Sequence, residues 1–199
     1  EDFFVVVILS RGRERQDAVK REVPPAMNVS KPSELILPAE PHRWSQFYRD
    51  HLLQFIIPFW LRYAVDEKFG GLLTCIGDEG QVFSSDKYLW SQTRALWTFS
   101  ALYRRIEPRA EWLELARQLY DFCRRVGMDE NDCWRFRTAR NGDPIDGPMS
   151  IVTDCFAIYG LVEFARITGE QEPIALALRT FASIERRLNS GQPFGTAPY

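Results

Sequence analysis

One arginine between two tryptophans is the feature of this sequence whose residue types and spacing could bind a ligand. Trp90, Arg94 and Trp97 follow one another at four- and three-residue steps, so on a helix they share one face. Two interpretations are open. The arginine stem packs on the rings with its head in water, or the cation forms the floor of an aromatic-lined pocket. Spacing alone favours the first, because helical arginines are usually surface residues.

Helices and two hairpins are expected to position these side chains. Apolar residues at three- and four-residue steps predict helices over about 43–65, 87–106, 109–126, 150–168 and 172–189. Pro58 is expected to kink or divide the first helix, and the last three are expected to close at Gly127, Gly169 and Gly191. Ser84, Ser85 and Asp86 are candidate N-caps for the second.

Two short hairpins interrupt the helical pattern. Strand-like runs at 72–76 and 81–83 flank a Gly-Asp-Glu-Gly turn, and runs at 133–138 and 144–147 flank Asn141-Gly142. Long paired helices joined by loops are typical of an α-solenoid or a closed α/α toroid, and the pattern does not choose between them.

Composition excludes several function classes. The net charge of −2 provides no electrostatic footprint for nucleic acid or an anionic membrane. The sequence has no dinucleotide fingerprint, no P-loop and no cysteine–histidine spacing typical of zinc, so no cofactor and no metal are predicted. The four cysteines form no C-x-x-C pair, which favours free thiols and a cytoplasmic location.

The first forty residues differ from the rest. Their apolar run, 3–9, is too short to span a membrane, and its arginines follow it, whereas a signal peptide carries its charge first. Proline-dotted, charged sequence without a period continues to about residue 41. We therefore expect a poorly specified N-terminal extension over 1–40 and one domain over 41–199.

Several ordered motifs carry a resemblance to a known family. The segment Asp86–Tyr103, with its Trp-x-Gln-x-Arg core, is similar to the hallmark stretch of the N-acylglucosamine 2-epimerase family. Residues 47–60 resemble its first helix and 70–75 its first hairpin. Thr153-Asp154-Cys155-Phe156 resembles its S-[DE]-C-F signature, with Thr in place of Ser. The similarity covers roughly 44–199.

The resemblance implies an all-α fold, the (α/α)6 barrel or toroid of twelve helices. This chain would supply the N-terminal half, a partial barrel of about five long helices with small β-hairpins. The implied partner is a small-molecule sugar, with no nucleic acid, no membrane and a possible homodimer.

The chemistry implied by the resemblance is proton transfer at C2 of an aldose, such as N-acetylglucosamine or N-acetylmannosamine. Arg94 matches the family's catalytic arginine, which serves the sugar oxygens, and Trp90 and Gln92 would line the same pocket. Lys87, Tyr88 and Asp154 are also candidate substrate-binding residues, although their side chains could equally brace the barrel interior.

The family's catalytic histidines lie in later helices. The two histidines here, His42 and His51, match neither position, so the chain alone is expected to be inactive. Two alternatives are a catalytically inactive sugar-binding or protein-interaction relative, and another α/α toroid such as a glycoside hydrolase, which would need two carboxylates such as Asp86 and Asp154.

Overall fold

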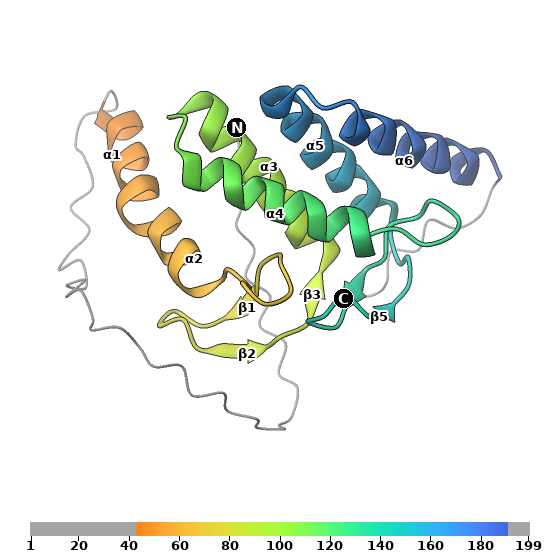
Figure 1. Cartoon of the computed structure of the whole chain (residues 1–199), viewed down its shortest axis with the longest axis horizontal. Helices are drawn as coiled ribbons and strands as arrows, with labels where there is room; N and C mark the ends of the chain where they lie inside the picture. Colours follow the sequence, from red (N-terminus) through yellow and green to blue (C-terminus); the bar gives the residue numbers. More distant parts are fainter. Residues whose placement is uncertain (1–42, 191–199) are drawn as a thin grey trace. The chain divides into compact units, whose positions relative to one another are not determined.

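A computed structural model of the chain describes residues 43–190, which belong to the compact unit His42–Tyr199. The predicted Gly191 helix end and the 1–40 segment lie outside the described residues. Among the described residues, no helix combines the length and apolar character needed to cross a bilayer. The elements (Figure 1), in chain order, are α1 (Trp44–His51), η2 (Leu52–Ile56), α2 (Ile57–Tyr63), β1 (Cys75–Ile76), β2 (Val82–Ser84), β3 (Lys87–Tyr88), α3 (Leu89–Arg105), α4 (Ala110–Val126), β4 (Arg137–Thr138), β5 (Pro144–Asp146), α5 (Ile151–Thr168) and α6 (Glu172–Asn189).

The first predicted helix is divided, as Pro58 indicates. Its middle segment, η2, is a π-helical turn, in which the Ile57 N–H donates to the Leu52 carbonyl. Proline has no N–H to donate to the carbonyl four residues earlier. The backbone hydrogen bonds can therefore change from the α-helical to the π-helical pattern immediately before Pro58 at little cost in free energy. The regular α-helix resumes as α2, with Pro58 in its first turn.

Helices α3 and α5 pack side by side and run in the same direction. Arg94 contacts Phe156 near their beginnings, and Arg104 pairs with Glu163 near their ends. Helix α4 packs against α3, and α6 packs against α5. Large apolar side chains fill the space between these helices and supply most of the hydrophobic stabilisation. They include Leu96, Phe99, Trp112, Leu119, Trp134, Leu161 and Phe164.

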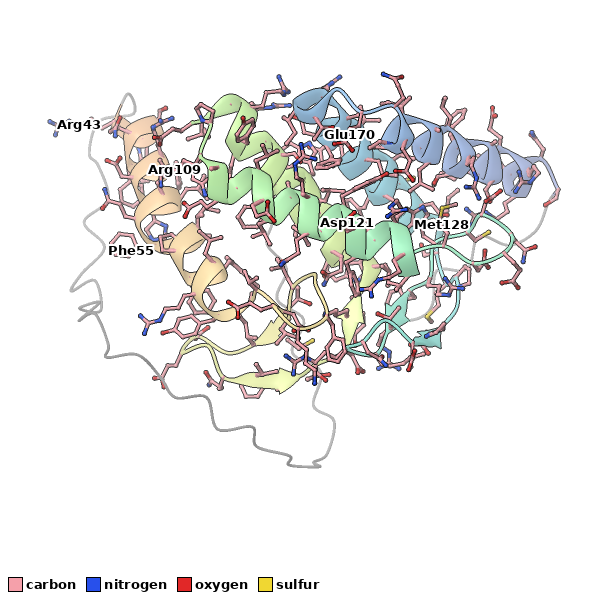
Figure 2. All side chains as sticks on the ribbon, in the orientation of Figure 1. Arg43, Phe55, Arg109, Asp121, Met128 and Glu170 are labelled. Atoms are coloured by element: carbon pink, nitrogen blue, oxygen red, sulfur yellow. The ribbon has the colours of Figure 1, made fainter. Side chains whose placement is uncertain are left out.

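Close backbone contact between α3 and α5 requires a glycine. A Cβ atom at Gly160 would lie 2.4 Å from the Thr93 carbonyl oxygen, a distance that real Cβ atoms do not show. Glycine at this position therefore allows the backbones of the two helices to lie closer together than any other residue would. A polar contact also joins α4 to the α5–α6 connection, where Glu170, labelled in Figure 2, lies. The Glu170 carboxylate accepts from Arg117 Nη1 of α4 at 2.7 Å.

The start of α3 differs from the sequence-based prediction. Lys87 and Tyr88 are not helical but form β3, which pairs antiparallel with β4 through Lys87–Thr138 and Tyr88–Arg137. The predicted caps at 84–86 are wrong. Tyr88 occupies the cap position without a side-chain bond, and the Leu89 N–H donates to the Phe136 carbonyl at 3.0 Å. The first free donor of α3 is thus satisfied by the second hairpin.

Both predicted hairpins exist. Strands β1, β4 and β5 are shorter than the predicted runs, while β2 has the predicted length and is displaced by one residue. Strand β1 pairs with β2, while β4 pairs with β5 and also with β3, so the second hairpin becomes a three-stranded sheet. Its turn lies at Asn141-Gly142, as predicted. The Ala139 N–H donates to the Asp143 carbonyl, and Gly142 adopts a positive φ of 102°.

Two glycines end helices for different physical reasons. Gly169, after α5, is left-handed, with φ 74°, as predicted for a C-terminal glycine. Gly127, after α4, remains right-handed, with φ −70°. Glycine is needed there because a Cβ atom would lie 2.3 Å from the buried Trp134 ring.

Candidate functional site

Arg94 of α3 lies beside aromatic rings from α3 and from the neighbouring helix α5. The Arg94 guanidinium carbon lies 5.6 Å from the Trp90 ring centroid and 5.1 Å from that of Phe156. Both distances are within the range of cation–π attraction. Trp90 and Arg94 therefore lie together, as their spacing predicts, and the second ring comes from α5.

The third member of the predicted face has a different neighbour. Trp97 stacks on Tyr159 of α5, with centroids 4.7 Å apart and ring planes 15° apart. The Arg105 guanidinium lies 5.6 Å from the Trp97 ring. We call Trp90, Arg94, Trp97, Phe156 and Tyr159 the aromatic face. All five side chains are half-buried or exposed, so each has surface that a ligand could contact.

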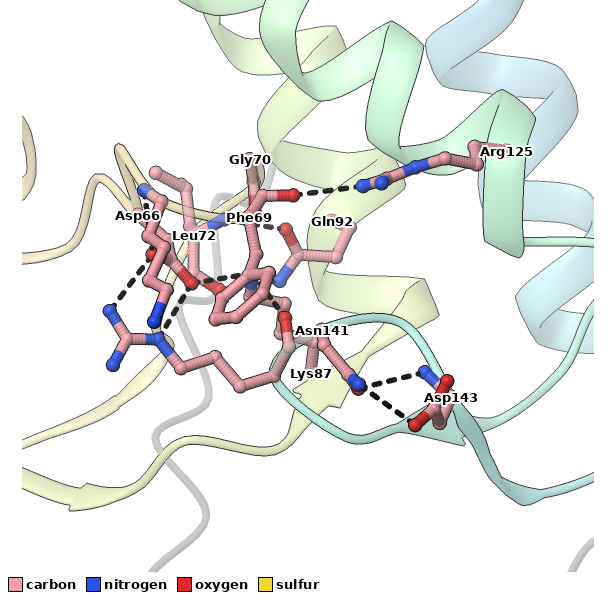
Figure 3. Close-up of polar contacts among 11 residues, drawn as sticks. Asp66, Phe69, Gly70, Leu72, Lys87, Gln92, Arg125, Asn141 and Asp143 are labelled. Carbon is pink, nitrogen blue, oxygen red and sulfur yellow. Dashed lines mark hydrogen bonds and ion pairs between the residues drawn. The ribbon is translucent and has the colours of Figure 1, made fainter.

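Lys87 lies inside the protein rather than on this face. Its ammonium is 0% exposed and donates to Asp66 Oδ2 at 2.8 Å, to the Arg140 carbonyl at 3.0 Å and to the Gly70 carbonyl (Figure 3). These three acceptors match the three donors of an ammonium group. Lys87 thus joins the loop after α2 to the second hairpin, and it packs over the Phe122 ring.

Asp66 is the residue that sequence reasoning missed. Its carboxylate is 0% exposed and accepts from Lys87 and from the Nε and Nη2 atoms of Arg140, at 3.0 and 2.9 Å. Burial acts to raise the pKa of Asp66, but the hydrogen bonds from Arg140 and Lys87 outweigh it and lower the pKa to about 2. No local pattern marks Asp66, because its partners lie 21 and 74 residues away.

Gln92 is also fully enclosed. Its Oε1 accepts from the Leu72 N–H, and its Nε2 donates to the Leu72 carbonyl, both at 2.8 Å (Figure 3). The side-chain amide therefore satisfies both backbone groups of one residue, as a neighbouring strand would. This contact holds the segment before β1 against α3, at a residue that lies between Trp90 and Arg94 along the helix.

Tyr88 and Asp154 have different environments. The half-buried Tyr88 ring lies edge-to-face with Phe136, 5.5 Å between centroids, and 5.9 Å from the Arg137 guanidinium carbon. Asp154 is completely buried. Its Oδ1 accepts from the Trp134 N–H at 3.1 Å and lies 2.8 Å from Arg187 Nη2. Burial raises the pKa of Asp154, against the opposing effects of Trp134 and Arg187.

The six candidate residues therefore lie in two kinds of environment. Trp90, Arg94 and Tyr88 retain accessible surface, whereas Lys87, Gln92 and Asp154 are enclosed and bonded to protein groups.

Neither of these two sets of residues contains a histidine. His51 of α1 lies between the rings of Phe47 and Phe55, at 6.1 and 5.4 Å, consistent with a packing role. Within residues 43–190, no group of three acidic, cysteine or histidine side chains could hold a metal ion.

Comparison with known proteins identifies the family. The model of the N-acylglucosamine 2-epimerase (GlcNAc 2-epimerase) family matches residues 71–196. The chain is 34% identical over 120 residues to mouse N-acylglucosamine 2-epimerase, covering 58% of this chain and 28% of the relative. It is 35% identical over 132 residues to cellobiose 2-epimerase of Bacteroides fragilis, covering 65% of this chain and 33% of the relative.

Solved structures agree with this assignment. Cellobiose 2-epimerase from Bacillus thermoamylovorans superposes with a TM-score of 0.67 at 26% identity, covering 72% of this chain and 37% of that one. Its fold is an (α/α)6 barrel, so the prediction of a partial barrel is confirmed. The chain spans about a third of the length of the curated relatives it matches. With the arginine and its motif in place on an α/α framework, this chain belongs to the N-acylglucosamine 2-epimerase family of carbohydrate epimerases.

Proposed function

We propose that this chain contributes the substrate-binding arginine to a sugar 2-epimerase or aldose–ketose isomerase. The observation that carries the proposal is Arg94, half-buried among aromatic rings on the α3–α5 pair. Apolar ring faces suit the C–H surfaces of a sugar, and a fixed guanidinium suits its oxygens. The names of the relatives fit an aldose, and the name of the mouse relative favours an N-acylglucosamine such as N-acetylglucosamine, whose 2-epimer is N-acetylmannosamine.

The proposed reaction starts with the loss of the proton on C2. After the sugar ring opens, a base removes this proton, the C–H electrons form a C1=C2 double bond, and the carbonyl electrons move onto O1 to give an enediolate-like intermediate. Return of a proton to the opposite face of C2 re-forms the C1 carbonyl and gives the epimer. Where C2 carries a hydroxyl group, return of the proton to C1, with transfer of the O2 proton to O1, gives the ketose instead. Arg94 would stabilise the negative charge that develops on the substrate oxygen. The acid and base must titrate near neutrality, and the proposal assigns them to parts of the family fold beyond these 199 residues.

The other candidate residues receive two proposed roles. Trp90 and Tyr88, which keep accessible surface, would contact the sugar directly. Lys87, Gln92 and Asp154 would act through the backbone segments they hold, since their polar groups bond to protein partners. The domain boundaries at 1–40 and 41–199, a homodimer and a cytoplasmic location stay predictions.

The test is proton exchange at C2. Purified protein is incubated with N-acetylmannosamine in heavy water, and the C2 proton is followed by NMR. The assay is run on the 199-residue chain and on a natural chain that contains it together with the remaining helices. Saturation-transfer NMR on the same samples reports sugar binding. Arg49→Ala, at an exposed position on α1, is the matched control.

We expect sugar binding by the short chain, exchange by the longer one, and loss of both in Arg94→Ala. Removal of one preorganised charge typically lowers the rate about 10²- to 10³-fold. Exchange that survives in Arg94→Ala at the rate of Arg49→Ala would overturn the assigned role. Binding without exchange, even in the longer chain, would favour an inactive sugar-binding relative.

A further inference from the structure

The second ring beside Arg94 has a role that the motif around Arg94 does not reveal. Phe156 lies on α5, 62 positions further along the chain, and its ring centroid is nearer to the guanidinium carbon, at 5.1 Å, than that of Trp90, at 5.6 Å. We propose that Phe156 is a positioning residue, which together with Trp90 holds the Arg94 guanidinium in the orientation that meets the sugar.

The backbone geometry supports this assignment. Gly160 allows α5 to approach the Thr93 carbonyl closely, and Phe156 lies one helical turn before Gly160. The same approach that packs the two helices therefore brings the Phe156 ring to Arg94. Trp90 reaches the guanidinium from one turn earlier on α3. Because the two rings belong to different helices, rotation of the arginine side chain is restricted from two separately anchored directions.

The chemistry of the ring is what matters for this role. An arginine side chain has several rotatable bonds, and it loses less freedom on binding when its guanidinium is already held. Aromatic rings attract the cation through their π-faces without competing for its N–H donors. A leucine at 156 could fill space but would not attract the cation.

The proposal rests on the proposed function for its catalytic meaning, but its first test requires no activity. NMR of the 199-residue chain records the Arg94 side-chain Nε–H signal, identified by its disappearance in Arg94→Lys. The ring current of an aromatic side chain shifts the NMR resonance of a proton that lies near the ring face. We compare Phe156→Leu, which removes the π-face, with Phe156→Tyr, which keeps it. The near-ultraviolet circular dichroism of both variants checks that the fold is retained.

We expect Phe156→Leu to move the Arg94 signal toward those of exposed arginines and Phe156→Tyr to leave it nearly in place. In the same samples, Phe156→Leu should weaken binding of N-acetylmannosamine roughly tenfold, and Phe156→Tyr by less than about threefold. In the longer chain, the loss should appear in kcat as well as in KM.

The outcomes separate the two proposals. An Arg94 signal that is unchanged in Phe156→Leu, or moved equally in both variants, would overturn the positioning role. A signal that moves as expected while neither variant nor the parent binds the sugar would support the positioning role and overturn the proposed function.

Discussion

Replacing Asp66 with asparagine should destabilise the protein strongly and in a pH-dependent way. The Asp66 carboxylate and the Lys87 ammonium are both 0% exposed, 2.8 Å apart, whereas Arg140 is 33% exposed and can turn toward water. Removing one partner of a buried ion pair typically costs about 3–5 kcal/mol, because the other charge is left uncompensated. Two backbone carbonyls still accept from Lys87, so we expect a loss of about 3 kcal/mol at pH 7.

The pH dependence follows from the lowered pKa. Asp66 titrates at about 2 in the folded protein and at an ordinary value of 3.8 when its partners are lost. A carboxyl group with a lowered folded-state pKa stabilises the protein above its unfolded pKa, and this stabilisation disappears as the pH falls through the folded value. The difference is worth roughly 2 kcal/mol. The stability gap between parent and variant should therefore be constant above about pH 5 and narrow by roughly 2 kcal/mol toward pH 2.

Urea unfolding from pH 7 to pH 2.5 measures this gap. Asp121→Asn is the matched control, because that carboxylate is 68% exposed and 3.9 Å from Arg124. The control should change stability by less than about 0.5 kcal/mol. A stability gap for Asp66→Asn below about 1 kcal/mol at pH 7, or one that stays constant down to pH 2.5, would contradict this prediction. The buried Asp66–Lys87 pair would then not stabilise the contact between the loop after α2 and the second hairpin.

Three further perturbations test the packing of the site. Gly160→Ala would place a Cβ atom 2.4 Å from a backbone oxygen of α3 and should cost about 1–3 kcal/mol in thermal unfolding, whereas Gly147→Ala, which meets nothing within 4 Å, should cost almost nothing; equal melting temperatures would contradict the close helix contact. Gln92→Leu leaves two enclosed backbone groups without partners and should cost about 2 kcal/mol in urea unfolding; a neutral effect would mean that water replaces the amide. Burial raises the pKa of the Cys123 thiol to about 12, so at pH 8 a thiol reagent should label the exposed Cys155 first and Cys123 only on unfolding, as mass spectrometry of the labelled peptides would show; early labelling of Cys123 would contradict its burial.

Short-range features of this protein follow from the sequence alone. Apolar steps of three and four residues predict four of the helices to within about two residues at each end, and Pro58 marks the break in the first. Asn141-Gly142 predicts the turn of the second hairpin, and the i, i+4 spacing predicts the contact of Trp90 with Arg94. Each depends on residues within one or two turns of each other, where backbone geometry alone sets the distance.

Long-range partners do not follow in this way. The sequence predicts Lys87 at the start of a helix, yet Lys87 lies in β3, which pairs with a strand some fifty residues away, and its ammonium donates to Asp66. Phe156 belongs to a family motif, but its contact with Arg94 depends on the approach that Gly160 permits.

The sequence by itself determined the helical elements, the family and the arginine at its hallmark position, because local bonding, periodicity and motif order are properties of neighbouring residues. The tertiary structure decided which candidate site residues keep accessible surface and which have their polar groups bonded to backbone or side-chain groups of other segments. That choice depends on where a polar group finds partners once water is excluded, and a buried Lys87 or Gln92 can be stable only if the folded chain supplies them.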